Sequence, residues 1–223
     1  MGKFLTLEVL LANRPVKVGL TYGLNENVRL LSISNEERLK DGQLIPRNTY
    51  MTFAKYDDKG KVIAQSEFSY YNLDATRDNV IKDLATQINQ LTSLANLYAP
   101  DVELDPFEGE EDMDIEAELR KPKVCRALID ALYKQFEKAV SKKIGDESPL
   151  LRMKVVVNKN NFVQLSNGDE SFAELMTVPA TETTLVMSAY DRGVRQKALT
   201  AAAAPKTADA TSSAPAADLL SKI

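Results

Sequence analysis

The sequence predicts an α+β fold, in which a five-stranded antiparallel barrel carries a two-helix insertion between its third and fourth strands. Two observations predict it. In the first third of the chain, and again from residue 150, short stretches have strand composition, with apolar and polar residues alternating in the clearest of them. Between these stretches, from Asp78, apolar residues recur at the three-to-four-residue spacing of a helix. The chain has 223 residues, 44% apolar and 27% charged, which suffices for one sizeable core or two small ones.

Strands are expected on both sides of the helical region. The turn Asp57-Asp58-Lys59-Gly60 is typical of a hairpin, because glycine accepts a positive φ. Residues 35–47 are charged, and we expect a loop there. The six expected strands are Val28–Ser34, Asn48–Asp57, Lys61–Leu73, Leu150–Asn158, Phe162–Ser166 and Thr184–Asp191.

Two helices are expected between the third and fourth strands. The first begins near Asp78 and is ended by Pro100, and the second runs from about Pro122 to Ile144, before Gly145. Lysines at helical spacing line one side of the second helix: Lys134, Lys138 and Lys142. A short helix near residues 192–201 closes the ordered part.

This order of elements predicts the domain organisation. Three meandering strands, a helical element and two returning strands form the five-stranded barrel called the OB-fold. Residues 1–199 are therefore expected to form an OB-like nucleic-acid-binding domain, with residues 74–148 as a helical and acidic insertion that is long for this fold. Residues 200–223 are expected to be a disordered linker, rich in Ala, Thr, Ser and Pro, that ends in a small apolar tip.

The composition argues against most enzyme classes. The chain has no histidine and a single cysteine, Cys125, so it cannot build a Ser-His-Asp or Cys-His triad or a zinc site. No phosphate-binding loop or dinucleotide fingerprint occurs, so we expect no cofactor. A lone cysteine favours a reducing compartment. No signal peptide or membrane span is visible, and we expect a non-catalytic, soluble protein of the cytoplasm with no membrane partner.

The charge is unevenly distributed. The net charge is −4, but residues 101–118 contain ten acidic residues and no basic one, which leaves 28 basic against 22 acidic residues, or +6, elsewhere. The acidic segment has three interpretations: a solvated loop, a flap that imitates phosphate and covers a basic face, or a cation site. The spacing of a calcium loop is absent, which disfavours the third.

Aromatic residues give the best positive indication of function. Six of the fifteen lie between Tyr50 and Tyr71. Strand alternation places one set of rings and cations on the outward face, where bases could stack and phosphates could be bound. The alternative is that these tyrosines are half-buried strand residues. The predicted nucleic-acid-binding set is Tyr50, Tyr56, Tyr71, Arg152, Lys154, Tyr190 and Arg192.

Several stretches of the chain resemble the single-stranded DNA-binding proteins of tailed bacteriophages. They are Val16–Asp74, with Asn25-Glu26-Asn27-Val28, Asn48–Tyr56 and Glu67–Leu73, and later Ser148–Val157 and Ser188–Ala198. The resemblance implies an OB-fold core that coats unwound DNA during replication or recombination in an infected bacterial cell. It also implies that the C-terminus recruits replication or recombination proteins, here through the tip residues Leu219, Leu220 and Ile223. Such proteins usually end in a strongly acidic tail, and this tip carries Lys222.

Two other function classes stay open from the sequence. One is a structural or interaction protein, such as a virion component or scaffold, that has no affinity for DNA. The other is a metal-dependent nuclease that uses clustered carboxylates. A defined assembly in solution would favour the first, and DNA cleavage that depends on divalent ions would favour the second.

Overall fold

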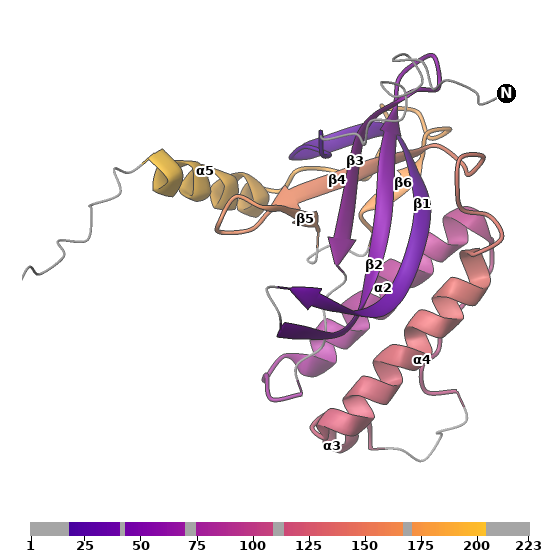
Figure 1. The fold of residues 1–223 in the computed structure, drawn as a ribbon, viewed down its shortest axis with the longest axis vertical. Coiled ribbons are helices and arrows are strands. Elements are labelled where there is room, and N and C mark those ends of the chain that lie inside the picture. The colour runs from indigo at the N-terminus through magenta and orange to yellow at the C-terminus, as the bar shows by residue number, and fades with distance from the viewer. Residues whose placement is uncertain (1–17, 41–42, 70–74, 109–113, 167–170, 204–223) are drawn as a thin grey trace, which may run out of the picture.

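The computed structural model describes residues 18–40, 43–69, 75–108, 114–166 and 171–203 (Figure 1). The fold is α+β, as predicted, but the predicted five-stranded barrel is not confirmed: the described strands form one open antiparallel sheet with the order β3-β2-β1-β4-β5, while β6 pairs with β4. The strands are β1 (Gly23–Lys40), β2 (Gln43–Tyr56), β3 (Val62–Ser69), β4 (Leu151–Val157), β5 (Val163–Leu165) and β6 (Ala173–Leu175). The helices are α2 (Val80–Tyr98), α3 (Ile115–Leu119), α4 (Pro122–Val140) and α5 (Ala189–Ala203).

The predicted meander and its hairpin turn are confirmed. β1 pairs with β2 and β2 with β3, both antiparallel. Between β2 and β3, the Asp57 carboxylate accepts hydrogen bonds from the backbone N–H groups of Lys59 and Lys61, and Gly60 has a φ of 74°. The aspartate therefore stabilises the turn by accepting backbone hydrogen bonds, and the glycine provides the positive φ.

The predicted loop at residues 35–47 is wrong over its described part. β1 and β2 stay paired as far as Lys40 and Gln43, with register shifts near Leu31 and Glu37. The loop was predicted because the segment is charged. A two-stranded ribbon that extends beyond the helix-covered part of the sheet can carry polar side chains on its surfaces, so charge does not exclude strands here. Arg38 bridges this ribbon to β3 through Glu67.

The hydrophobic core lies between one face of the sheet and the helices α2 and α4, which lie side by side below it in Figure 1. Both helices were predicted, and α4 begins at Pro122 and ends at Val140, one turn before the expected Ile144. The core is built from the alternate residues of the strands and one stripe of each helix. Its strand residues include Val28, Leu30, Met51, Phe53, Phe68, Leu151, Met153 and Val155, and its helix residues include Leu84, Leu91, Leu94, Leu128, Leu132, Phe136 and Val140.

The C-terminal part of the domain differs from the prediction. The segment Thr184–Asp191, predicted to be a strand, is irregular up to Ser188 and continues as α5 from Ala189. Ser188 and Asp191 form a reciprocal cap: the Asp191 carboxylate accepts from the Ser188 N–H, and the Ser188 hydroxyl accepts from the Asp191 N–H. This cap begins a helix that runs to Ala203, so its last turn lies inside the segment predicted to be linker.

Candidate nucleic-acid interface

β4 has the predicted alternation, but its outward residues are buried. Leu151, Met153 and Val155 lie in the core, and Arg152 and Lys154 point to the opposite face. That face is covered by the chain from β6 to α5, so Arg152 is 3% and Lys154 2% exposed. The prediction that these two cations face the solvent is therefore wrong, although their side of the sheet was assigned correctly.

Arg152 is held by two carboxylates. Its guanidinium pairs with Glu174 on β6 and, through Nε at 3.1 Å, with Glu26 on β1, and it also donates to the carbonyl of Val178. The hydrogen bonds to Glu174 and then Glu26 raise the pKa of Arg152. The positive charge is neutralised within the fold, which is a structural role.

Lys154 joins the sheet to the start of α5. Its ammonium lies 2.8 Å from the Asp191 carboxylate. Burial alone would raise the pKa of Asp191, but the hydrogen bonds from Lys154 and Ser188 outweigh it, so the pKa is lowered. Asp191 thus caps α5 and fixes the helix to β4 at the same point.

Tyr50 and Tyr56 lie outside the main core, on the face predicted for them, and both are buried beneath arginines. The Arg38 guanidinium carbon is 3.5 Å from the centre of the Tyr50 ring, and that of Arg29 is 5.1 Å from the centre of the Tyr56 ring. The predicted open platform is therefore covered by arginines of β1. A role for the two rings in binding DNA stays a prediction, and it requires these arginines to move.

Tyr190 and Arg192 are exposed, although they lie on α5 and not on a strand. Tyr190 is 78% exposed, the largest value among the apolar and aromatic side chains of the described residues. Tyr71 and the tip residues Leu219, Leu220 and Ile223 lie outside the described residues.

The hairpin between β4 and β5 presents an aromatic residue that the sequence analysis did not single out. Phe162 is 68% exposed and follows a turn in which the Asn158 side chain accepts from the N–H groups of Asn160 and Phe162. Asn161 has a φ of 63°, which closes the turn, and Lys159 is exposed at its tip. The signal in the sequence was the polar run Asn158–Asn161 between two apolar stretches, followed directly by a ring.

This hairpin and α5 lie on the same side of the molecule (Figure 1). At the start of α5, Asp191 contacts Lys154 of β4. One turn further along the helix, the Arg195 guanidinium carbon is 4.3 Å from the centre of the Tyr22 ring. Tyr22 precedes Gly23, and Gly23 pairs with Val155 of β4. The helix therefore follows β4 toward the hairpin. We call Lys159, Phe162 and the exposed α5 residues Tyr190, Arg192, Arg195 and Lys197 the hairpin–α5 surface.

The hairpin–α5 surface is positively charged. Its four cations are Lys159, Arg192, Arg195 and Lys197, and the structure shows no ion pair between any of them and a carboxylate of the described residues. The one acid of α5, Asp191, is already paired with Lys154. Exposed rings and uncompensated cations are the two groups that hold an unpaired strand, the rings by stacking and the cations by phosphate contact.

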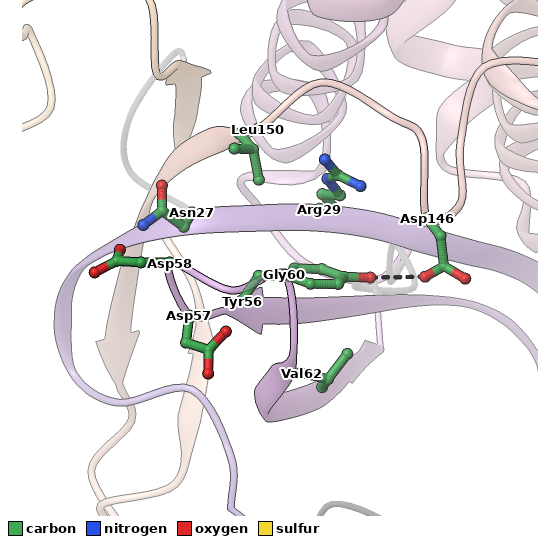
Figure 2. Close-up of a pocket in the computed structure, with 9 residues that line it drawn as sticks. All are labelled: Asn27, Arg29, Tyr56, Asp57, Asp58, Gly60, Val62, Asp146 and Leu150. Carbon is green, nitrogen blue, oxygen red and sulfur yellow. Dashed lines mark hydrogen bonds between the residues drawn. The ribbon is translucent and has the colours of Figure 1, made fainter.

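An open groove of about 570 Å³ lies at the other end of β4 (Figure 2). Figure 2 shows Asn27 and Asp58 toward one end and Asp146 toward the other, with Tyr56 between them. The Tyr56 hydroxyl donates to Asp146 at 2.8 Å. Burial, and then this hydrogen bond, raise the pKa of Tyr56 to about 12. The remaining lining residues are Arg29, Asp57, Gly60, Val62 and Leu150.

The described part of the acidic segment packs near α4. The Asp114 carboxylate caps α3 by accepting from the Ala117 N–H, and Gln135 of α4 donates to the Asp105 carbonyl. Figure 1 shows α3 at the bottom of the molecule and α5 projecting to the left, far from α3. Within the described ranges there is no group of three or more acidic or cysteine side chains that could hold a metal ion, and no helix long and apolar enough to cross a membrane.

Comparison of the chain with models of protein families, with curated proteins and with solved structures gives no match.

Proposed function

We propose that this protein is a non-catalytic single-stranded DNA-binding protein that coats unwound DNA in the replication or recombination of a tailed phage inside its bacterial host. One observation carries the proposal: two exposed rings, Phe162 on the β4–β5 hairpin and Tyr190 on α5, belong to elements that also carry four exposed cations without an ion pair to a described carboxylate. Stacking on rings, combined with phosphate contacts, binds an unpaired strand with little regard to its sequence.

The order of the strands supports the same proposal. In an OB-fold the first strand pairs with the second and the fourth, the second with the third, and the fourth with the fifth. The order β3-β2-β1-β4-β5 is that arrangement opened between β3 and β5. OB-folds bind oligonucleotides with the face of strands 2 and 3 and with the loops between strands 1 and 2 and strands 4 and 5. The hairpin that carries Phe162 occupies the last of these positions.

The experiment is a titration of a fluorescein-labelled oligothymidine with the full chain, followed by anisotropy at several salt concentrations. Each exposed ring is expected to contribute about 1–3 kcal/mol of stacking, so Phe162→Ala and Tyr190→Ala should each weaken binding by about fivefold to 150-fold. Ile81→Ala, which removes an exposed apolar side chain on α2, is the matched control and should bind as the wild type does.

Salt dependence tests the cations separately. If all four contact phosphates, the logarithm of the binding constant should fall with the logarithm of salt concentration with a slope of about −3. Lys197→Gln should reduce the steepness by about 0.7, whereas Lys142→Gln, at an exposed position just beyond the C-terminal end of α4, should leave it unchanged. Wild-type protein that shows no binding at low salt, and instead forms a defined assembly, would replace this proposal with a structural role.

The C-terminal tip completes the proposal. Leu219, Leu220 and Ile223 form an apolar end that would recruit replication or recombination proteins while the domain holds DNA. Removal of residues 219–223 should leave the affinity for oligothymidine unchanged. A change in that affinity would mean that the tip acts on the DNA site itself.

A further inference from the structure

The groove in Figure 2 contains a buried cationic donor without a hydrogen-bond partner among the described residues. This donor is Nε of Arg29, which lies on β1 over the Tyr56 ring. The Arg29 side chain also makes no ion pair with a carboxylate that the structure describes, although three aspartates line the same groove. Because Nε is enclosed by the fold, an acceptor in the groove would be met by the two terminal nitrogens of the Arg29 guanidinium, which also make no hydrogen bond with the described residues.

The charge of the groove excludes a phosphate or carboxylate as that acceptor. One arginine against Asp57, Asp58 and Asp146 gives the lining a formal charge of −2. Asp57 is used by the turn, where it accepts from two backbone N–H groups. Asp58 is exposed, and Asp146 accepts a hydrogen bond only from the Tyr56 hydroxyl among the described residues. Asp58 and Asp146 lie toward opposite ends of the groove, so one of these carboxylates, and not both, can accept from the donor edge of a base that also offers an acceptor to Arg29.

We propose that this groove binds a single unstacked guanine base. Guanine offers the acceptors O6 and N7, which suit an arginine, and the donors N1–H and N2–H₂ on the adjoining edge, which suit carboxylates. Thymine offers one N–H donor and fits this lining less well. Tyr56, Val62 and Leu150 supply apolar walls, and a volume of about 570 Å³ lies in the range of small-molecule sites.

The inference concerns a site apart from the hairpin–α5 surface. The groove lies near Leu150 and Val28, at the beginning of β4, whereas the hairpin follows the end of β4. A guanine preference would fix the position of the bound strand at one base, while the hairpin–α5 surface accepts any base. Either site can exist without the other.

The test is a titration of the isotope-labelled full chain with 2′-deoxyguanosine 5′-monophosphate, and separately with thymidine 5′-monophosphate, followed by NMR. Both nucleotides carry the same sugar and phosphate, so a difference between them reports the base. The proposal expects saturable shifts of the amide signals of Asn27, Asp58, Gly60 and Val62 with the guanine nucleotide, at an affinity at least fivefold higher than with the thymine nucleotide.

Two conservative variants test the donor and the acceptor. Arg29→Lys keeps the charge but removes the planar fork, and Asp58→Asn changes an exposed turn residue; each should weaken guanine binding by roughly five- to 100-fold. Arg38→Lys is the matched control, because Arg38 also stacks on a β2 tyrosine but is held by Glu36 and Glu67, and it should change nothing. Equal shifts with both nucleotides, shifts confined to the hairpin–α5 surface, or unchanged binding in Arg29→Lys and Asp58→Asn would each overturn the guanine site. All three results would leave the strand-binding proposal intact.

Discussion

Replacement of Arg152 by methionine separates a structural role from a DNA-binding role for this residue. The Arg152 side chain is 4% exposed and that of its partner Glu174 is 12% exposed. Removal of the guanidinium leaves the Glu174 carboxylate nearly buried without its ion-pair partner, while Glu26, about half exposed, returns to water. Breaking one partner of a buried pair costs about 3–5 kcal/mol. The partial exposure of Glu174 places the expected loss near the lower end, at about 3 kcal/mol.

Urea denaturation measures this loss. With an m value of about 2 kcal/mol per molar, Arg152→Met should lower the urea midpoint by about 1.5 M. Lys121→Met removes an exposed ion pair with Glu118 and should cost less than about 1 kcal/mol. The double variant Arg152→Met/Glu174→Leu removes both charges and should recover stability to within about 1 kcal/mol of the wild type, because a hydrophobic replacement of a buried pair is often neutral.

The same variants are then tested with oligothymidine. Because Arg152 is enclosed by β6 and β1, the folded double variant should bind DNA with the wild-type affinity. An Arg152→Met protein that is as stable as the wild type but binds DNA several-fold more weakly would refute the reasoning, since it would show that this guanidinium contacts phosphate.

Two further predictions concern pH. The lowered pKa of Asp191 means that its contribution to stability is present above its ordinary value of 3.8 and is lost as the pH falls further, so the difference in urea midpoint between the wild type and Asp191→Asn should shrink below about pH 4. The raised pKa values of Tyr56, to about 12, and of the buried Tyr98 mean that unfolding releases phenol protons above pH 10, so the free energy of unfolding should fall as the pH rises through that value. Tyr56→Phe should reduce this alkaline loss; an unchanged slope above pH 10 would contradict the raised pKa of Tyr56, which burial and then the hydrogen bond to Asp146 cause.

Strand alternation in the sequence predicted the side of the sheet correctly on β4, whereas the alternation assigned to Tyr190 and Arg192 fell on α5 and is wrong. On β4 the assignment of Leu151 and Met153 to the core and of Arg152 and Lys154 to the other face is correct. Alternation cannot show what covers that second face. The second face is covered by β6, which is only three residues long, and by α5, which begins at Ala189 and not near residue 192 as predicted. The Ser188-x-x-Asp191 pattern was a readable sign of the helix start.

The burial of Tyr50 and Tyr56 has a similar cause. The expected first strand ended at Ser34, so Arg38 was assigned to a loop and could not be placed over Tyr50. Pairing of β1 with β2 beyond that point depends on the register between distant residues, which a single sequence does not specify. Phe162 was overlooked because an aromatic at the start of a short strand is ordinarily a packing residue, and its exposure follows from the position of the hairpin at the end of the sheet.

The proposed function requires an unpaired strand to lie on the hairpin–α5 surface. Photochemical cross-linking of the full chain to oligothymidine, with mapping of the modified peptides, locates the bound strand. Cross-links to Phe162 or Tyr190 are expected, and they should disappear when unlabelled oligothymidine competes. Cross-links confined to the peptides of Tyr50 and Tyr56, or to α4, would place the strand elsewhere and overturn the proposal.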